Sequence, residues 1–180
     1  MLEYPINIDS NANSSSKLRG KGLLMRKRFD EQYQIGSKPI QDIQFNPKSR
    51  DDIPQVLRGL QYIFTTPDLH EAIFSVMEKT IDTQSRAGRP GMDLWQILVM
   101  GCLRLNLNWD YDRLHEMVNE HLTIRSMLTI NTDEEFGDPK QFQLQTLKDN
   151  VRLLTPEMLD EINQLVVKAG HQLLKKKMTH

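Results

Sequence analysis

The fold is decided by the stretch Gly88–Ile130, which reads GRPGMDLWQILVMGCLRLNLNWDYDRLHEMVNEHLTIRSMLTI. After the break at Pro90-Gly91, Asp93 is a residue type that caps helix N-termini. The apolar residues that follow recur at helical spacing and occupy nearly every side of the helix. A helix that is apolar nearly all round is buried. We therefore expect a helix from Leu94 to about Leu105 at the centre of an all-α domain.

The turn after this helix predicts a compact helical pair. It places Asn108 where the chain must reverse, and asparagine is the non-glycine residue that best tolerates left-handed backbone. We expect Asp110 to cap a second helix and Thr123 to cap a short third one. Helix, tight turn and helix is the pattern of a DNA-binding helix-turn-helix, and other compact helical pairs share it. The sequence therefore predicts a helix-turn-helix-like centre and leaves its role open.

Further helices flank this centre. The helical domain is expected to span residues 49–154, with one helix capped by Ser49 and another starting at Pro67. A long C-terminal helix, capped by Thr155, is expected in residues 155–180, a segment leading toward a further domain. Its apolar positions, Met158, Ile162, Leu165, Ala169 and Leu173, step by three and four. Such a seam either packs on the domain or pairs with another copy of the chain.

Residues 1–48 are expected to form a flexible, partly basic N-terminal tail. The first 24 residues are polar and rich in Ser and Asn, which predicts disorder. Residues 17–28 carry six positive charges and no acid: Lys17, Arg19, Lys21, Arg26, Lys27 and Arg28. They are either a basic arm that lies along DNA phosphates or a solvated tail without a partner.

Composition narrows the classes of function. The 23 basic and 24 acidic residues nearly cancel, so the charge of the whole chain gives no support to nucleic-acid binding. The single cysteine, Cys102, excludes a disulfide within the chain. No apolar run approaches the length of about 20 residues that crosses a bilayer. Since the N-terminus also lacks a signal-peptide core, we expect a cytoplasmic protein without a membrane partner.

The strongest candidate for DNA contact is the segment from Lys140 to Leu154. Its apolar stripe consists of Leu144, Leu147, Val151 and Leu154. The candidate DNA-binding residues on its other faces are Gln143, Gln145, Thr146, Lys148, Asn150 and Arg152. Amide side chains pair with adenine edges, and Arg and Lys pair with guanine or phosphate. The alternative is an ordinary polar helix surface.

Two further arginines, Arg86 and Arg89, lie in the linker before the central stretch. Arg89 stands in a Gly-Arg-Pro sequence, which either enters a narrow minor groove or forms a plain inter-helix turn. The second central helix is a poorer candidate, because its outward positions carry three acids and one arginine. These expected outward residues are Asp112, Arg113, His115, Glu116, Asn119 and Glu120.

The sequence carries no pattern of a catalytic, metal or cofactor site. It has no Gly-rich phosphate loop, nucleophile elbow or zinc motif. His115 and His121 are six residues apart, which puts them on different faces of a helix and without a cysteine partner. We therefore expect no catalytic residue, no metal and no cofactor, and we expect that the chain is not an enzyme by itself.

The run GRPGMDLW-ILV-G-LRLN-NWDYD-LHE resembles the N-terminal region of insertion-sequence DDE transposases, particularly the ISNCY-type group. The likeness extends from about Met25 to Lys177 and includes the segments 45–54, 57–63 and 145–151. It implies a helical region that binds the terminal inverted repeats of the element, ahead of a ribonuclease-H-like catalytic domain. It also implies that the 140–154 helix plays the recognition part.

The resemblance leaves three hypotheses about the chain. In the first, it is the DNA-binding part of a transposase, separated from its catalytic domain by truncation, frameshift or cutting, with a homodimer as a further expectation. In the second, it is a helical self-association or protein-interaction module that does not bind DNA. In the third, the enzyme is split over two reading frames, and catalysis resides outside these residues.

Overall fold

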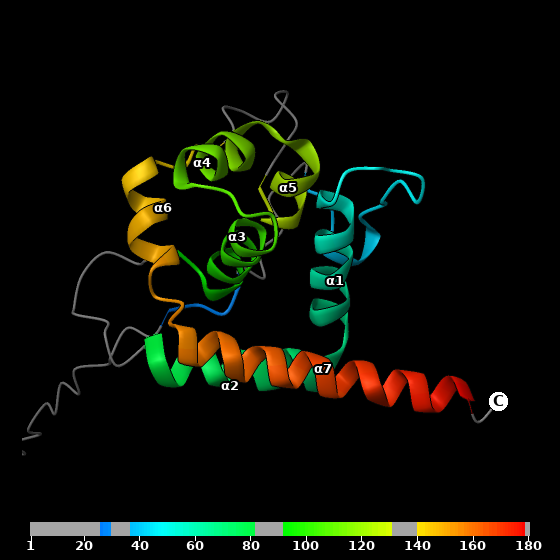
Figure 1. Cartoon of the computed structure of the whole chain (residues 1–180). Coiled ribbons are helices and arrows are strands. Elements are labelled where there is room, and N and C mark those ends of the chain that lie inside the picture. The colour runs from blue at the N-terminus through cyan, green and yellow to red at the C-terminus, as the bar shows by residue number, and fades with distance from the viewer. Residues whose placement is uncertain (1–25, 30–36, 82–91, 131–139, 179–180) are drawn as a thin grey trace, which may run out of the picture.

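A computed structural model describes residues 26–29, 37–81, 92–130 and 140–178. Every regular element among these residues is helical, which confirms the predicted all-α class (Figure 1). In chain order they are η1 (Ile40–Asp42, a 3₁₀ turn), α1 (Ile53–Thr65), α2 (Pro67–Ile81), α3 (Leu94–Asn106), α4 (Tyr111–Glu120), α5 (Leu122–Met127), α6 (Leu144–Val151) and α7 (Pro156–Met178). None of the described helices is both long enough and apolar enough to cross a bilayer.

Helix α3 is the centre of the core. Every residue from Leu94 to Gly101 is buried, as the apolar pattern predicts. Two polar side chains in this stretch are satisfied by the short helix α5 and its end. Trp95 Nε1 donates to the Met127 carbonyl at 2.8 Å, and Gln96 Nε2 donates to the Leu128 carbonyl at 3.1 Å. Because both groups are hydrogen-bonded, their burial carries no unpaired-donor penalty.

The turn between α3 and α4 has the predicted geometry. Asp93 caps α3 by accepting the Gln96 N–H at 2.7 Å, and Asp110 caps α4 by accepting the Arg113 N–H at 2.7 Å. Asn108 lies between the two helices with a φ of 52°, in the left-handed region. These contacts confirm the sequence prediction for this corner.

Two predicted caps are wrong. Helix α5 is capped by His121, whose Nδ1 accepts the Ile124 N–H at 3.3 Å, so Thr123 lies inside the helix. Helix α1 begins at Ile53, after Ser49 and Asp52, with Pro54 in its first turn. The N–H groups in the first turn of a helix have no partner within the helix. Because proline has no N–H, its presence there costs no hydrogen bond and favours a helix start at this point.

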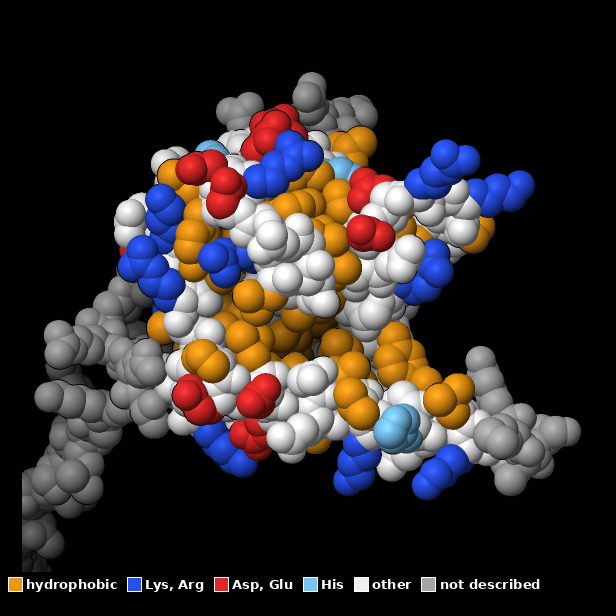
Figure 2. Space-filling view, in the orientation of Figure 1, with side chains coloured by type: hydrophobic (Ala, Val, Ile, Leu, Met, Phe, Trp, Pro, Cys, Tyr) orange, Lys and Arg blue, Asp and Glu red, His pale blue; other side chains and the backbone are white. Residues whose placement is uncertain are grey.

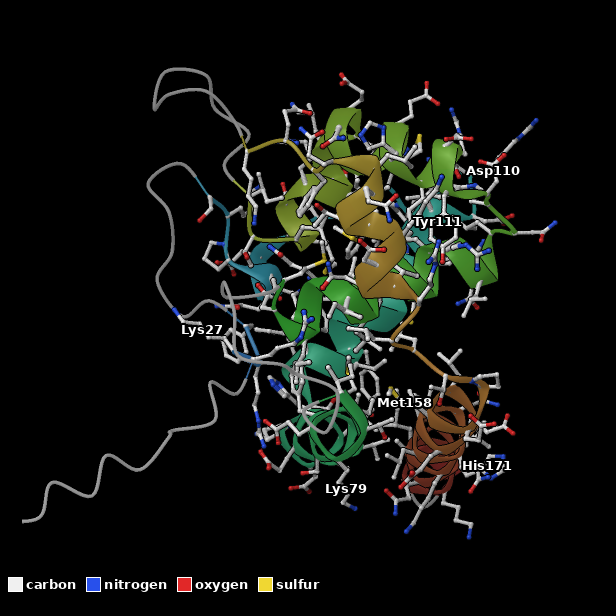
Figure 3. The ribbon with its side chains drawn as sticks, turned by 90° about the vertical axis from the view of Figure 1, so that its left-hand side faces the viewer. Lys27, Lys79, Asp110, Tyr111, Met158 and His171 are labelled. Carbon is white, nitrogen blue, oxygen red and sulfur yellow. The ribbon has the colours of Figure 1, made fainter. Side chains whose placement is uncertain are left out.

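Helices α2 and α7 form a layer on one side of α3, where they run antiparallel side by side (Figures 1 and 3). Met158 and Ile162 of α7 are buried in this contact. Thr155 caps the helix, its hydroxyl accepting the Met158 N–H at 3.3 Å. The first half of α7 therefore belongs to the core, rather than to a linker that begins at residue 155.

The chain around residues 26–29 and 40–43 also packs on the domain, which corrects the prediction of a flexible tail up to residue 48. The Lys27 and Arg28 carbonyls accept the N–H groups of Leu94 and Trp95 at 3.0 and 2.8 Å, at the start of α3. A helix start leaves such N–H groups without partners inside the helix. This segment therefore completes the cap of α3.

Side chains of residues 26–29 and 40–43 also contact the domain. The rings of Phe29 and Phe64 meet edge to face at 5.3 Å. Ile40 and Ile43 are buried, and Gln61 Nε2 donates to the Ile40 carbonyl at 2.8 Å. The structure thus gives these residues a place in the core. The prediction of disorder for the first 24 residues lies outside the described part of the chain.

Candidate nucleic-acid interface

Helix α6 is shorter than the predicted segment 140–154. It begins at Leu144 and ends at Val151, and it packs on α3 and α4. Leu147 and Val151 are buried on its inner side. The helix is therefore anchored by one apolar face, and its opposite face is left to solvent.

The chain that leads into α6 is fixed by polar side chains of α4 and α5. Asn119 Oδ1 accepts the Phe142 N–H at 2.8 Å, and its Nδ2 donates to the Phe142 carbonyl at 3.1 Å. His115 Nε2 lies 2.8 Å from the same carbonyl, and Arg125 donates to the Lys140 carbonyl at 3.1 Å. The prediction that His115 and Asn119 face outward on α4 is therefore wrong. Both side chains hold the chain that enters α6.

Arg125 also binds the end of α4. Its side chain is buried and donates to the Asn119 carbonyl at 3.1 Å. Burial lowers the pKa of Arg125, and the charge of Glu120 partly opposes that shift. A cation is favourable near a helix C-terminus, where the last carbonyls are unpaired. Arg125 thus joins the end of α4 to the chain that enters α6.

The outer face of α6 carries most of the predicted DNA-binding residues. Gln143, Gln145, Thr146 and Arg152 are exposed, and Lys148 is partly exposed. Figure 2 shows Lys and Arg side chains over this helix. Asp149, which was not among the predicted residues, is also exposed on α6 and accepts a hydrogen bond from Gln145 Nε2 at 2.7 Å. The face therefore combines amides, a hydroxyl, two cations and one acid.

Asn150 does not belong to this face. It is 8% exposed, its Oδ1 accepts from Arg26 Nη1 at 2.6 Å, and its Nδ2 donates to the Thr146 carbonyl at 2.7 Å. Position 150 lies three residues after the buried Leu147, which is the spacing of one helix face. This spacing could have excluded Asn150 as a base-reading residue.

Other predicted basic contacts are placed differently or not described. Arg86 and Arg89 lie in residues 82–91, outside the described part of the chain. Lys17, Arg19 and Lys21 lie in residues 1–25, which are also outside it. Arg28 does not extend into solvent as a free arm. It forms salt bridges with Glu71 and Glu78 of α2, both at 2.6 Å. Its charge is therefore already neutralised within the domain.

Helix α4, beside α6, presents an acidic exposed face. Asp112, Glu116 and Glu120 are exposed, and Arg113 pairs with Glu116 at 2.7 Å. Figure 3 shows where α4 begins, at Asp110 and Tyr111. Such a face repels phosphates, so α4 is a poorer candidate than α6 for a helix that enters a DNA groove.

Neither a metal-binding cluster nor a reactive thiol is found among the described residues. Among them no group of three or more His, Cys, Asp or Glu side chains is placed to hold a metal ion. Desolvation raises the pKa of the Cys102 thiol to about 12. A thiol with such a pKa stays protonated near neutral pH, and the thiolate is the reactive form. Cys102 therefore acts as a small apolar group on α3.

Comparison of the chain with protein-family models, with curated proteins and with solved structures gives no match. The resemblance to the N-terminal region of DDE transposases therefore stays a prediction from the sequence.

Proposed function

We propose that the chain binds double-stranded DNA through the outer face of α6. In this proposal it is the DNA-recognition part of an insertion-sequence transposase, and its target is the terminal inverted repeats of the element. The chain itself performs no catalysis in this reading; the catalytic carboxylates belong to a further domain.

One observation carries the proposal: α6 is buried on one side and presents amide and basic side chains on the other. Gln143 and Gln145 supply the donor and acceptor pair that matches an adenine edge, and Arg152 matches guanine or phosphate. Leu147 and Val151 anchor the helix, so these side chains stand on a rigid element. A fixed helix loses little conformational freedom when it enters a groove.

The acidic face of α4 predicts how DNA approaches. Exposed acids of α4 repel the phosphates, so the duplex lies over α6 and away from α4. The near-neutral charge of the whole chain does not oppose this geometry, because binding depends on the local face. We therefore expect moderate affinity that depends on few phosphate contacts.

The proposal is tested by selecting duplexes from a random-sequence library with the full chain. Affinity for a selected duplex is then compared with that for a shuffled duplex, at several salt concentrations. We expect preference for the selected duplex, and a loss of affinity with salt whose slope is about −0.9 per phosphate contact. A flat salt response without any enriched sequence contradicts DNA binding.

Variants then locate the interface. Lys148→Ala and Arg152→Ala should each weaken binding, with a salt slope smaller by about one if the side chain contacts a phosphate. Lys79→Ala, an exposed lysine on α2, is the matched control and should bind as the wild type does. If the double variant Lys148→Ala/Arg152→Ala keeps wild-type affinity, α6 is not the DNA-binding helix.

A second candidate function is self-association without DNA binding. The exposed acids of the α4 face favour it over a nucleic-acid partner. The same binding experiment separates the two functions, since a self-association module enriches no duplex.

A further inference from the structure

Helix α7 is longer than the layer that it covers. It has 23 residues, whereas its antiparallel neighbour α2 has 15. At about 1.5 Å per residue, α7 is longer by about 12 Å. Figure 1 shows its C-terminal part projecting past α1 and α2. The C-terminal part of α7 therefore packs on the domain only where it begins, and the rest extends beyond α2.

The two sides of α7 differ in their neighbours. Met158 lies toward α2, whereas His171 points away from it (Figure 3). The outward side carries Val167, Gly170 and Leu174 at spacings of three and four, and Val167 and Leu174 are 47% and 61% exposed. A shallow hollow runs along this side, lined in part by Asn163, Gln164, Val167, Lys168 and His171. Val167 and Leu174 therefore expose two apolar side chains on the outside of the helix, among mostly polar neighbours.

The charge along α7 changes sign from one end to the other. Its first two turns carry the exposed acids Glu157, Asp160 and Glu161. No acid follows Glu161 to the end of the helix, and the exposed basic residues there include Lys168 and Lys175. A surface that is acidic at one end and basic at the other complements an inverted copy of itself.

We propose that two copies of this chain pair through the outer sides of their α7 helices, antiparallel and about a twofold axis near Val167. Residues on one flank of the first α7 helix then face residues on the same flank of the second, in a fixed order. Glu157 faces Lys175 of the second copy, Glu161 faces His171, and Gln164 faces Lys168. Leu174 of each copy covers the first turn of the other helix.

The antiparallel direction follows from the charges. A parallel pair would set the acidic ends together and the lysine-rich ends together, which costs free energy at both ends. An antiparallel pair is isologous, so each favourable contact occurs twice. The pairing rests on α7 alone and does not depend on the DNA proposal. If both hold, the pair presents two α6 faces related by a twofold axis.

The test is the mass of the full chain in solution without DNA, measured by sedimentation at increasing concentration. We expect the apparent mass to rise from 21.0 kDa toward twice that value, and to fall again when salt is added. A mass that stays at 21.0 kDa at every concentration overturns the proposal.

Charge reversal tests the register. Glu157→Lys and Lys175→Glu each place like charges against each other, so each variant alone should remain monomeric. Mixing the two variants restores opposite charges at both ends and should restore the doubled mass. Rescue by mixing cannot come from a folding defect. Lys79→Glu on α2 is the control and should associate as the wild type does; an equal loss in that variant overturns the proposed interface.

Oxidation of cysteine variants tests the direction. Val167→Cys should form a disulfide between copies, because the axis passes near this position. Leu174→Cys should not, since its two copies would lie about 24 Å apart along the antiparallel pair. Crosslinking of both variants indicates a parallel pair and overturns the proposal. A Val167→Asp variant that is monomeric and still binds duplex DNA leaves the DNA proposal intact.

Discussion

Gly101 of α3 faces the side chain of Leu154, in the chain that follows α6. A Cβ atom at this position would collide with the Leu154 side chain, whereas a Cβ at Gly59 of α1 would meet nothing within 4 Å. The absence of a side chain at Gly101 thus lets the end of α6 approach the central helix. Since Leu154 is itself buried, it has little room to move away.

We expect Gly101→Ala to destabilise the protein by about 1 kcal/mol. Overpacking costs about 1–3 kcal/mol, and the better helix propensity of alanine returns about 1 kcal/mol. Gly59→Ala, the matched control, should gain up to about 1 kcal/mol from propensity alone. The free energy of unfolding from urea titrations measures both. The explanation is wrong if Gly101→Ala costs as much in a Leu154→Ala background as in the wild type.

Single residues were predictable where their role depends on near neighbours in sequence. Asp93, Asn108 and Asp110 act within three residues of their own position, and the structure confirms all three. Asn150 was assigned to the DNA-binding face, although its partner Arg26 lies 124 residues earlier. No local pattern indicates such a partner, and only the spacing of Asn150 from Leu147 indicated that its side chain is buried.

At the scale of elements, α6 owes its position to the chain before it. The Phe142 N–H and carbonyl are both bonded to Asn119, within a buried part of the domain. Arg125 holds the Lys140 carbonyl on the other side of this contact. The orientation of the candidate DNA-binding face therefore depends on side chains that never touch DNA.

Removing the Asn119 amide should loosen this attachment. Asn119→Ala leaves the buried Phe142 N–H without its partner and leaves the Phe142 carbonyl with His115 alone, which costs about 1–3 kcal/mol. Gln141→Ala, an exposed change in the same segment, should stay within about 0.5 kcal/mol of the wild type. Thermal and urea unfolding measure the difference. Equal stability of the two variants would show that the Asn119 contacts do not hold α6.

The sequence predicted the existence of the helices better than their ends. The apolar stripe predicted α6, but not that it begins only at Leu144, because Phe142 and Lys140 are fixed by contacts from α4 and α5. The long C-terminal helix was predicted, and its packing on α2 was one of two open alternatives. Helix ends and neighbours depend on tertiary contacts, which periodicity does not contain.

At the scale of the whole molecule, Arg28 ties the N-terminal segment to α2. Its guanidinium binds Glu78 and Glu71, and these hydrogen bonds raise the pKa of Arg28. The bond from Arg28 is the main reason that the pKa of Glu71 lies below its ordinary value of 4.5. A carboxylate whose pKa is lowered in the folded state stabilises the fold at a pH above the pKa of the unfolded chain. This contribution is lost as the pH falls through the pKa of the folded state.

We therefore expect acid to destabilise the wild type more than Arg28→Ala. Between about pH 6 and pH 3 the Tm of the wild type should fall more steeply, because the variant has no Arg28 contact to lose. Arg113→Ala removes an exposed pair within α4 and is the control, with an expected wild-type slope. Parallel curves for the wild type and Arg28→Ala would contradict this linkage.

The charge pattern near the N-terminus was the least predictable part of the whole. Counting cations without acids suggested an arm for phosphates, whereas Arg28 meets acids that stand 43 and 50 residues further along the chain. A count of charges along the sequence does not reveal ion-pair partners that are so far apart in the chain. For the same reason, the net charge of the chain says little about the face of α6.

The hydrogen bond between Arg26 and Asn150 also has a consequence for synthesis. A ribosome that adds about 5–20 residues per second needs roughly 6–25 s to make the 124 residues between the two partners. During this interval the nascent chain lacks both Asn150 and the α7 surface that covers α2. The core is therefore completed only after nearly the whole polypeptide has been made, and until then the side of α2 that α7 covers lacks its neighbour.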